Sequence, residues 1–325
     1  MKMSEKVLEL LEKNRGKYLS GEEIANTLDV SRAAVWKAVE DLRKSNVEIA
    51  AAKNKGYMLE DKDNSLSAPG INAVLGESKF EVHTQHTVTS TNTVLKELAK
   101  NGAKAGYVLV AQEQTAGKGR LGRNFYSPVD TGLYLSVVLR PKMTIEDSLF
   151  ITTSAAVAVA KAIETVSEGK ITPEIKWVND VFIDGKKVCG ILTEASVDFE
   201  SGGLEYAVLG IGINIFPPQG GFPEEVDKVA TAVFKSKEEV KNARNRLAAE
   251  VIKQLENLPK NYTSPEILKE YKQRSMLIGK KVFAVTKNER RPCKVMDIDD
   301  RARLVVEFEN GDIKALSTGE VSIRI

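Results

Sequence analysis

The spacing of apolar residues predicts a small helical domain at the start of the chain. In residues 1–62 apolar side chains recur at helical spacing, and Val35, Val39 and Leu42 fall on one helix face. Ser20 and Ser31 stand where N-caps are expected, so we expect helices from 21 and over 32–45. Short apolar runs at 47–52 and 56–59 follow and predict a hairpin. Two helices, a tight turn and a hairpin are typical of a winged helix-turn-helix.

The pattern changes at about residue 66, where strand-like and helix-like stretches begin to alternate. Apolar runs predict strands, and helical spacing predicts helices. The Ala-rich helix expected over 149–166 has few polar residues, so we expect it to be deeply buried. Ser90 is expected to cap the first of these helices. A Gly/Pro-rich stretch at 217–222 predicts a mobile loop. The expected strands are 107–111, 133–139, 181–183, 188–192 and 207–215, and the expected helices are 91–101, 149–166, 237–258 and 265–274.

The end of the chain contains only short strand patterns. They cover 282–285, 292–298, 304–308 and 313–315, separated by turn signals such as Asn310-Gly311. This spacing is typical of a small barrel. The sequence therefore predicts a multidomain α+β protein: a winged helix-turn-helix at 1–62, a mixed α/β domain at 66–275 and an SH3-like barrel at 276–325. The polar residues 61–65 are expected to be a linker.

Composition narrows the classes of function. The chain has 325 residues, 42% of them hydrophobic, and a net charge of +2 from 47 basic and 45 acidic residues. This excludes a disordered chain and a uniformly basic nucleic-acid coat. Cys189 and Cys293 lie far apart, and no signal peptide or membrane span is visible, so we expect a cytoplasmic protein. The two histidines, His83 and His86, do not form a zinc-protease motif, and no G-x-S-x-G motif occurs.

Charge within the first domain favours DNA binding. Residues 1–30 sum to −1, whereas residues 31–55 sum to +3. The positive charge therefore lies on the second helix and the hairpin turn, where phosphates contact such domains. A helix-turn-helix that serves only for packing is the alternative. The candidate DNA-binding residues are Ser31, Arg32, Ala33, Trp36 and Lys37 on the helix and Lys53 and Lys55 at the turn.

A glycine-rich basic loop follows the first strong strand of the middle domain. Residues 117–123 read G-K-G-R-L-G-R. No helix follows at once, which argues against a dinucleotide fold, and no Ser or Thr follows the lysine as in a Walker A loop. Glycine amides and the cations Lys118, Arg120 and Arg123 suit phosphate oxygens. A solvated basic turn is the alternative.

Three further clusters lie in the same domain. Residues 176–180 read K-W-V-N-D, which also fits a simple Asx-turn. Lys187 begins an otherwise apolar strand, where it either points into a pocket or extends to solvent at a sheet edge. Residues 210–214 read G-I-G-I-N, and glycines in a strand allow close approach to the sheet.

Taken together, these motifs resemble those of biotin protein ligases. Ser90-Thr91-Asn92 and Gln114–Arg123 resemble S-T-N and Q-x-A-G-[RK]-G-R. The later clusters resemble K-W-P-N-D, G-K-K-x-x-G-I-L and G-I-G-I-N, in the same order and spacing. The S-R-A-A-V-W-K helix and the terminal barrel resemble the bifunctional bacterial type, in which the ligase is also the biotin-operon repressor. Lys118 and Val178 depart from the family's usual arginine and proline.

The resemblance implies a biotin/lipoate ligase-like central fold and roles for individual residues. Lys187, Arg120 and Asp180 are the implied catalytic residues, Asp180 as a base for the acceptor lysine. The implied biotin-binding residues are Ser90, Thr91, Asn92, Gln114, Lys118, Gly119, Arg120 and Lys187. The implied ATP-binding residues are Arg120, Arg123, Phe125, Asn179, Lys187 and Asn214; the metal ligands are left open.

The resemblance also implies a two-step reaction and its partners. Biotin and ATP, with Mg²⁺, would give biotinyl-5′-AMP, and a lysine of a biotin carboxyl carrier domain would then accept the biotinyl group. Operator DNA and a homodimer formed with bound adenylate are the implied regulatory partners, and no membrane is implied. Two alternatives stay open: a ligand-sensing transcription factor without ligase activity, and a lipoyl- or octanoyl-type acyltransferase with Cys189 as nucleophile.

Overall fold

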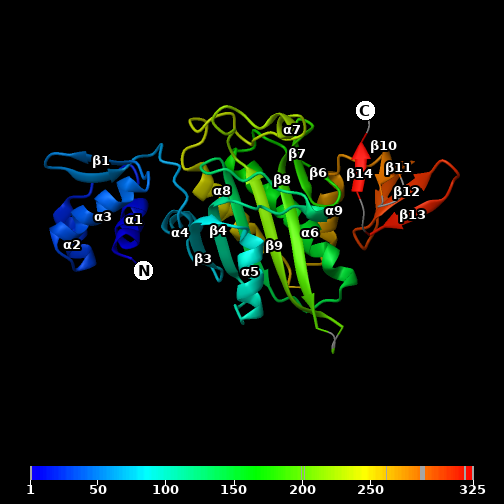
Figure 1. Ribbon diagram of the computed structural model, residues 1–325, viewed down its shortest axis with the longest axis horizontal. Coiled ribbons are helices and arrows are strands. Elements are labelled where there is room, and N and C mark those ends of the chain that lie inside the picture. Colours follow the sequence, from blue (N-terminus) through cyan, green and yellow to red (C-terminus); the bar gives the residue numbers. More distant parts are fainter. Residues whose placement is uncertain are drawn as a thin grey trace.

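Three groups of elements follow one another along the computed structural model (Figure 1). The N-terminal helices and hairpin lie at one end, a large sheet with its helices lies in the middle, and a small sheet lies at the other end. The structure describes residues 2–198, 200, 202–260, 262–285, 290–317 and 320–323. The predicted fold class, a multidomain α+β chain, is confirmed.

The winged helix-turn-helix is present as predicted. Ser20 Oγ accepts from the Glu23 amide at 3.0 Å and Ser31 Oγ from the Ala34 amide at 3.2 Å, so both serines cap their helices. Val7, Ile24 and Val39 are fully buried in a core of its own. The elements are α1 (Met3–Lys13), α2 (Gly21–Leu28), α3 (Arg32–Lys44), β1 (Ile49–Ala52) and β2 (Gly56–Leu59).

A seven-stranded sheet forms the middle domain. Its strand order is β3-β4-β5-β9-β8-β7-β6, with β3 and β4 parallel and every other pair antiparallel. The strands are β3 (Glu81–Val88), β4 (Tyr107–Gln114), β5 (Gly132–Leu139), β6 (Glu174–Lys176), β7 (Asp180–Ile183), β8 (Lys186–Val197) and β9 (Leu204–Asn214). The predicted strands are all found, but β3 and β6 were not predicted.

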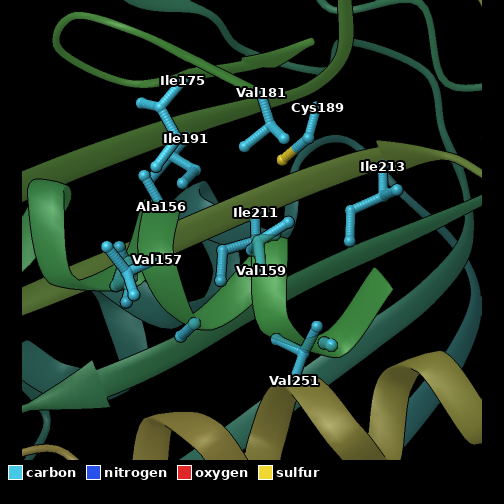
Figure 2. Packing of buried hydrophobic residues seen from close by; sticks show 14 of the residues in the cluster. Ala156, Val157, Val159, Ile175, Val181, Cys189, Ile191, Ile211, Ile213 and Val251 are labelled. Carbon is cyan, nitrogen blue, oxygen red and sulfur yellow. The ribbon is translucent and has the colours of Figure 1, made fainter. Parts of the chain in front are cut away.

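Helices cover the two faces of this sheet unequally. The apolar α6 and the amphipathic α8 pack on one face, where Val157, Val251 and Ile211 meet in the main core (Figure 2). On the other face α5 brings Leu95 and Ala99 against Val208. The helices are α4 (Ala68–Leu75), α5 (Thr91–Lys100), α6 (Leu149–Val166), α7 (Glu224–Asp227), α8 (Ala243–Glu256) and α9 (Pro265–Gln273), with short 3₁₀ turns η1 (Arg120–Gly122) and η2 (Glu146–Ser148).

The long apolar helix is a core element, as predicted. The segment Glu146–Val166 is the one described stretch long and apolar enough to cross a bilayer, and 72% of its most apolar window is buried. Ala155, Ala160 and Ile163 are fully buried. Burial all round explains its uniform apolar composition.

Two local predictions in this domain are wrong. The helix predicted from 237 begins only at Ala243, because Asn242 has a left-handed backbone (φ 52°) that a continuous helix cannot contain. Ser90 occupies the N-cap position of α5, but its side chain makes no capping hydrogen bond. The Gln114 side chain takes that role instead, since its Oε1 accepts from the Thr91 amide at 2.9 Å.

The C-terminal strands form one five-stranded antiparallel sheet of order β13-β12-β11-β10-β14. Val282 and Val295 belong to the same buried cluster as Ile175 and Trp177 of the middle domain. Trp177 Nε1 donates to the carbonyl of Ala302 at 3.0 Å. The small sheet therefore supports the turn that carries Trp177. Its strands are β10 (Lys281–Val285), β11 (Arg290–Ile298), β12 (Leu304–Phe308), β13 (Ile313–Leu316) and β14 (Glu320–Ile323).

Within the predicted linker 61–65, Asp63 and Asn64 are buried, whereas Asp61 and Lys62 are exposed. Asp63 is 1% exposed, and its carboxylate accepts from the Glu48 amide and the Ser65 hydroxyl. Asn64 Oδ1 accepts from the Ala243 amide at 2.8 Å. These residues are polar because they satisfy buried hydrogen bonds across the joint. The exact domain boundaries remain a prediction.

A buried ionic cluster fixes this joint. Arg15 donates to both carboxylate oxygens of Glu12 at 3.0 Å and lies 3.6 Å from Asp63 Oδ2. Its Nη1 also donates to the carbonyls of Glu60 and Asp63. Burial raises the pKa of the Glu12 carboxyl, and Arg15 partly offsets the rise.

Arg15→Ala should destabilise the full chain by about 3 kcal/mol, because it leaves two buried carboxylates without their cation. The pKa of Glu12 then rises further. A carboxyl whose pKa is raised by folding destabilises the native state as the pH rises through that value, so the loss should shrink between pH 7 and pH 5. Urea denaturation of the wild type and the variant at both pH values measures this difference in the free energy of unfolding. Lys13→Ala, which breaks the exposed Lys13–Glu9 pair, is the control and should cost under about 0.5 kcal/mol.

Candidate active site

A cavity of about 370 Å³ lies on the sheet face that α6 and α8 leave uncovered. Twelve of the thirteen residues predicted for the catalytic, biotin and ATP sites line it. They are Ser90, Thr91, Asn92, Gln114, Lys118, Gly119, Arg120, Arg123, Phe125, Asn179, Asp180 and Lys187. The lining does not include Asn214, which ends β9 and donates from its side chain to the carbonyl of Thr231 at 3.1 Å.

The floor of the cavity follows from strand alternation. Tyr134, Gly212, Gly190 and Asp180 are direct neighbours across β5, β9, β8 and β7. A Cβ on Gly212 would lie 2.6 Å from the Phe125 ring, and one on Gly190 would lie 3.3 Å from it. The two glycines therefore make room for Phe125, whose ring also meets Tyr134 edge to face at 6.5 Å between centroids.

A neutral hydrogen-bonded corner lies at the start of α5. Thr91 Oγ1 donates to Gln114 Oε1 at 3.2 Å, and Gln114 Nε2 donates to Ser127 Oγ at 2.9 Å. The buried Ser136 hydroxyl lies 2.6 Å from Thr91 Oγ1 and 2.7 Å from Asn92 Oδ1. This corner presents hydroxyl and amide groups without a formal charge, which suits a neutral polar ligand group.

The glycine-rich loop is folded back on itself over the cavity. The Gly119 amide donates to the Arg123 carbonyl at 2.7 Å, and the Phe125 amide donates to the Gly117 carbonyl at 2.8 Å. Arg120 Nη1 donates to Asn179 Oδ1 at 3.0 Å, which joins the loop to the K-W-V-N-D turn. The prediction that this turn belongs to the site, rather than being a simple Asx-turn, agrees with this contact.

Positive charge dominates the rest of the lining. The lining contains five cations, Lys118, Arg120, Arg123, Lys176 and Lys187, and one carboxylate, Asp180. Lys187 Nζ lies 2.7 Å from Asp180 Oδ1. Lys187 is held by its backbone as well, because its amide donates to the Val229 carbonyl and its carbonyl accepts from the Thr231 amide. A cavity with this charge excess fits a polyanion such as a nucleotide phosphate chain.

Cys189 is excluded as a nucleophile of this cavity. Its side chain lies on the opposite sheet face, fully buried beside Val181 and Ile213 (Figure 2). Burial raises the pKa of its thiol far above the ordinary value, so the reactive thiolate does not form.

The residues predicted to bind DNA lie on the surface of the winged helix. Trp36 is 59% exposed, and the others on α3 and at the β1–β2 turn are exposed as well. Arg43 and Lys44, by contrast, pair with Glu40 and Asp41. The candidate interface consists of Ser31, Arg32, Ala33, Trp36, Lys37, Lys53 and Lys55.

Known proteins share both parts of this arrangement. Residues 85–214 match the biotin/lipoate A/B protein ligase family, and residues 4–58 match a helix-turn-helix (HTH) domain family. The bifunctional ligase/repressor BirA of Bacillus spizizenii is 33% identical over 98% of this chain and 97% of its own length. The chain belongs to the bifunctional biotin ligase/repressor family.

Other members agree with this placement. BirA of Escherichia coli is 28% identical over 95% of this chain and 94% of its own length. The structure of the biotin protein ligase from Aquifex aeolicus in complex with biotin and ATP superposes with a TM-score of 0.58 at 28% identity, covering 76% of this chain and 99% of that one.

The two departures from the family pattern leave the cavity lining intact. Lys118 lines the cavity in the usual arginine's place, so the charge is kept but the planar two-point geometry is lost. Val178 follows Trp177 through a cis peptide bond, and Asn179 and Asp180 line the cavity after it.

The sequence analysis did not predict several residues that support the candidate active site. Ser127, Ser136 and Glu194 support the neutral corner by hydrogen bonds but lie in no motif. The sequence offered one sign of Ser136, since it is a serine within the otherwise apolar run 132–139. Its neighbours along β5 face the core, so the Ser136 side chain points to the sheet face that carries the cavity.

Proposed function

We propose that this protein activates biotin with ATP and transfers the biotinyl group to a lysine of a biotin carboxyl carrier domain. The observation that carries the proposal is the two-part cavity: a neutral hydrogen-bonding corner lies at one end, and five cations lie around the rest. The neutral corner, with Ser90, Thr91 and Gln114, suits the uncharged ureido ring. The cations suit the biotin carboxylate and the triphosphate.

The first step is adenylation. A carboxylate oxygen of biotin attacks the α-phosphorus of ATP, a bond forms between them, and pyrophosphate leaves with the bonding electrons. Lys187 and Arg120 neutralise the charge that two anions bring together, and Lys118 and Gly119 close the loop over the adenylate. Phe125 packs on the adenine, and Arg123 and Asn179 complete the nucleotide site.

Mg²⁺ fits this lining if it arrives on the nucleotide. Asp180 is the single carboxylate of the lining, and the described residues hold no cluster of three or more His, Cys, Asp or Glu side chains able to bind a metal. Mg²⁺ is commonly held by one or two carboxylates together with substrate phosphates. Asp180 would hold the ion, which would neutralise phosphate charge.

The second step is acyl transfer. The amine of the carrier lysine attacks the carbonyl carbon of the mixed anhydride, and AMP leaves. The amine must lose a proton, and we assign its acceptance to Asp180, the single carboxylate of the lining. Incubation with labelled biotin, ATP and a carrier domain tests the whole proposal. Absence of both labelled carrier and pyrophosphate would leave the transcription-factor alternative.

We propose that the winged helix binds the biotin operator and that biotinyl-5′-AMP acts as corepressor by favouring a homodimer. Two chains would place two α3 helices on one palindromic site. A ligand shifts DNA affinity only if it binds one state of the protein better than another. Operator affinity with and without biotin plus ATP, at fixed salt and protein concentration, tests this. Equal affinities in both conditions would refute the corepressor role.

Gly212→Ala should weaken ATP binding more than biotin binding. The added Cβ would lie 2.6 Å from Phe125, so the ring must leave the place assigned to adenine packing. We expect the KM for ATP to rise about tenfold, the worth of a packed aromatic contact. In a Phe125→Ala background the same change should add little, because the clash is gone. Independent, additive losses would show that Phe125 is not the reason.

A further inference from the structure

Glu194 lies outside every motif, yet it is tied directly to the neutral corner of the cavity. It stands on β8, two residues beyond Leu192 and on the same sheet face. Its two carboxylate oxygens take donors from one face of α5. Oε2 accepts from Asn92 Nδ2 at 2.9 Å, and Oε1 accepts from Lys96 Nζ at 2.9 Å. Asn92 and Lys96 are one helical turn apart, so Glu194 fixes the start of α5 on the sheet.

The hydrogen bonds of Asn92 are fully used inside the protein. Its Nδ2 has two hydrogens, and these go to Glu194 and to the Leu192 carbonyl at 3.2 Å. Its Oδ1 faces the Ser136 hydroxyl at 2.7 Å. A Cβ on Gly210 would lie 2.2 Å from the same oxygen, so the amide is packed directly on the sheet. Asn92 therefore has no amide hydrogen left for a ligand, unlike Ser90, whose hydroxyl makes no capping bond.

We propose that Glu194 is a positioning residue for the biotin ureido corner and that it acts through Asn92, which orients Ser136 and Thr91 rather than donating to biotin itself. The proposal rests on the proposed ligase function. Glu194 sets which end of the Asn92 amide faces Ser136. The Ser136 hydroxyl lies between Asn92 and Thr91, and Thr91 donates to Gln114. The orientation of the ligand-facing groups thus depends on a carboxylate that lies behind them.

Glu194 stays ionised in this setting. Burial raises the pKa of its carboxyl, but hydrogen bonds from Lys96 and Asn92, with the nearby positive charge of Lys118, bring the pKa below its ordinary value. An ionised acceptor holds Asn92 more firmly than a neutral one. Glu194 is therefore a fixed acceptor at every pH at which a ligase would be assayed.

The test measures the affinity of the full-length protein for biotin and, separately, for ATP by calorimetry. Glu194→Ala should weaken biotin binding about tenfold and leave ATP binding within twofold, because only the neutral corner loses its support. Glu194→Gln should restore most of the biotin affinity. Its amide oxygen can still accept from Asn92, and the half-exposed Lys96 can turn to solvent. Lys96→Met should have little effect for the same reason.

Glu205→Ala is the matched control, since Glu205 also accepts a hydrogen bond across the sheet, from Ser196 at 2.9 Å, but neither residue belongs to the cavity lining. Wild-type biotin affinity in Glu194→Ala overturns the proposal. Equal losses for biotin and ATP, or a loss in Glu205→Ala of the same size, also overturn it, because they indicate a general structural role. Failure of the wild-type protein to bind biotin at all refutes the proposed function, and this inference with it.

Discussion

Lys187→Ala is expected to lower biotin-dependent pyrophosphate release by roughly 10³-fold while the protein stays folded. Removing one preorganised group that stabilises developing charge costs about 10²–10³-fold, and Lys187 faces both reacting anions in the proposed mechanism. Its backbone bonds to Val229 and Thr231 do not depend on the side chain. The loss should appear in kcat, because the charge to be neutralised is greatest in the transition state.

Lys186→Ala provides the control for that variant. Lys186 is the preceding residue on β8, and its Nζ donates to the Asp227 carbonyl at 2.8 Å, outside the cavity lining. Its removal takes away the same formal charge from the same strand, so activity should stay within about twofold. Comparable losses in both variants, or near-normal pyrophosphate release in Lys187→Ala, would remove Lys187 from the catalytic role.

The local parts of the fold and site could be predicted because their signals are local. Ser20 and Ser31 precede helical runs, and the caps form as expected. Gly210 and Gly212 are two residues apart and Gly190 pairs with Gly212, so the common face of these glycines follows from the two-residue period. Lys187 lies three residues before Gly190 and reaches the same cavity where the pairing of β7 and β8 shifts register, which the period does not predict. The loop cations and the Asn179-Asp180 pair could be predicted to lie in one site because both belong to recognisable motifs of a known family.

What could not be predicted depends on contacts distant in sequence. Glu194 lies 102 residues from Asn92, and no periodicity links them. β3 mixes polar and apolar residues because it is an edge strand, so its pattern does not stand out. Asp63 and Asn64 look like linker residues, since polarity alone does not distinguish solvation from buried hydrogen bonding.

One segment connects the cavity to the joint between the domains. Val229 and Thr231 pair with the backbone of Lys187. Farther along the same segment, the Lys237 carbonyl accepts from Asn64, and Lys241 pairs with Asp61 at 3.1 Å. A change of this segment with ligand would therefore be felt at Lys187 and at the winged helix together. The contacts supply the physical continuity that the corepressor proposal requires.

Neutralising the candidate DNA interface should abolish tight operator binding while sparing the ligase. The change replaces Arg32, Lys37, Lys53 and Lys55 together with alanine. All four are exposed, and none forms an ion pair within the described part of the chain, so their charge is available to phosphates. The salt dependence of binding is the slope of log K against log salt concentration, and each lost phosphate contact reduces its magnitude by about 0.9. We therefore expect a slope smaller by roughly 3–4 per chain and an affinity lower by on the order of 100-fold.

The matched control removes the same charge elsewhere, by replacing Lys79, Lys100, Lys104 and Lys142, which are exposed on the middle domain. Operator affinity is measured by titration at several salt concentrations, with biotin and ATP present, and carrier biotinylation is measured on the same preparations. The interface variant should lose DNA binding and keep biotinylation, whereas the control should keep both. If the two variants lose the same affinity, net charge rather than the α3 helix and the β1–β2 turn attracts DNA. The winged helix would then serve packing alone, because a specific interface must depend on where its charges lie.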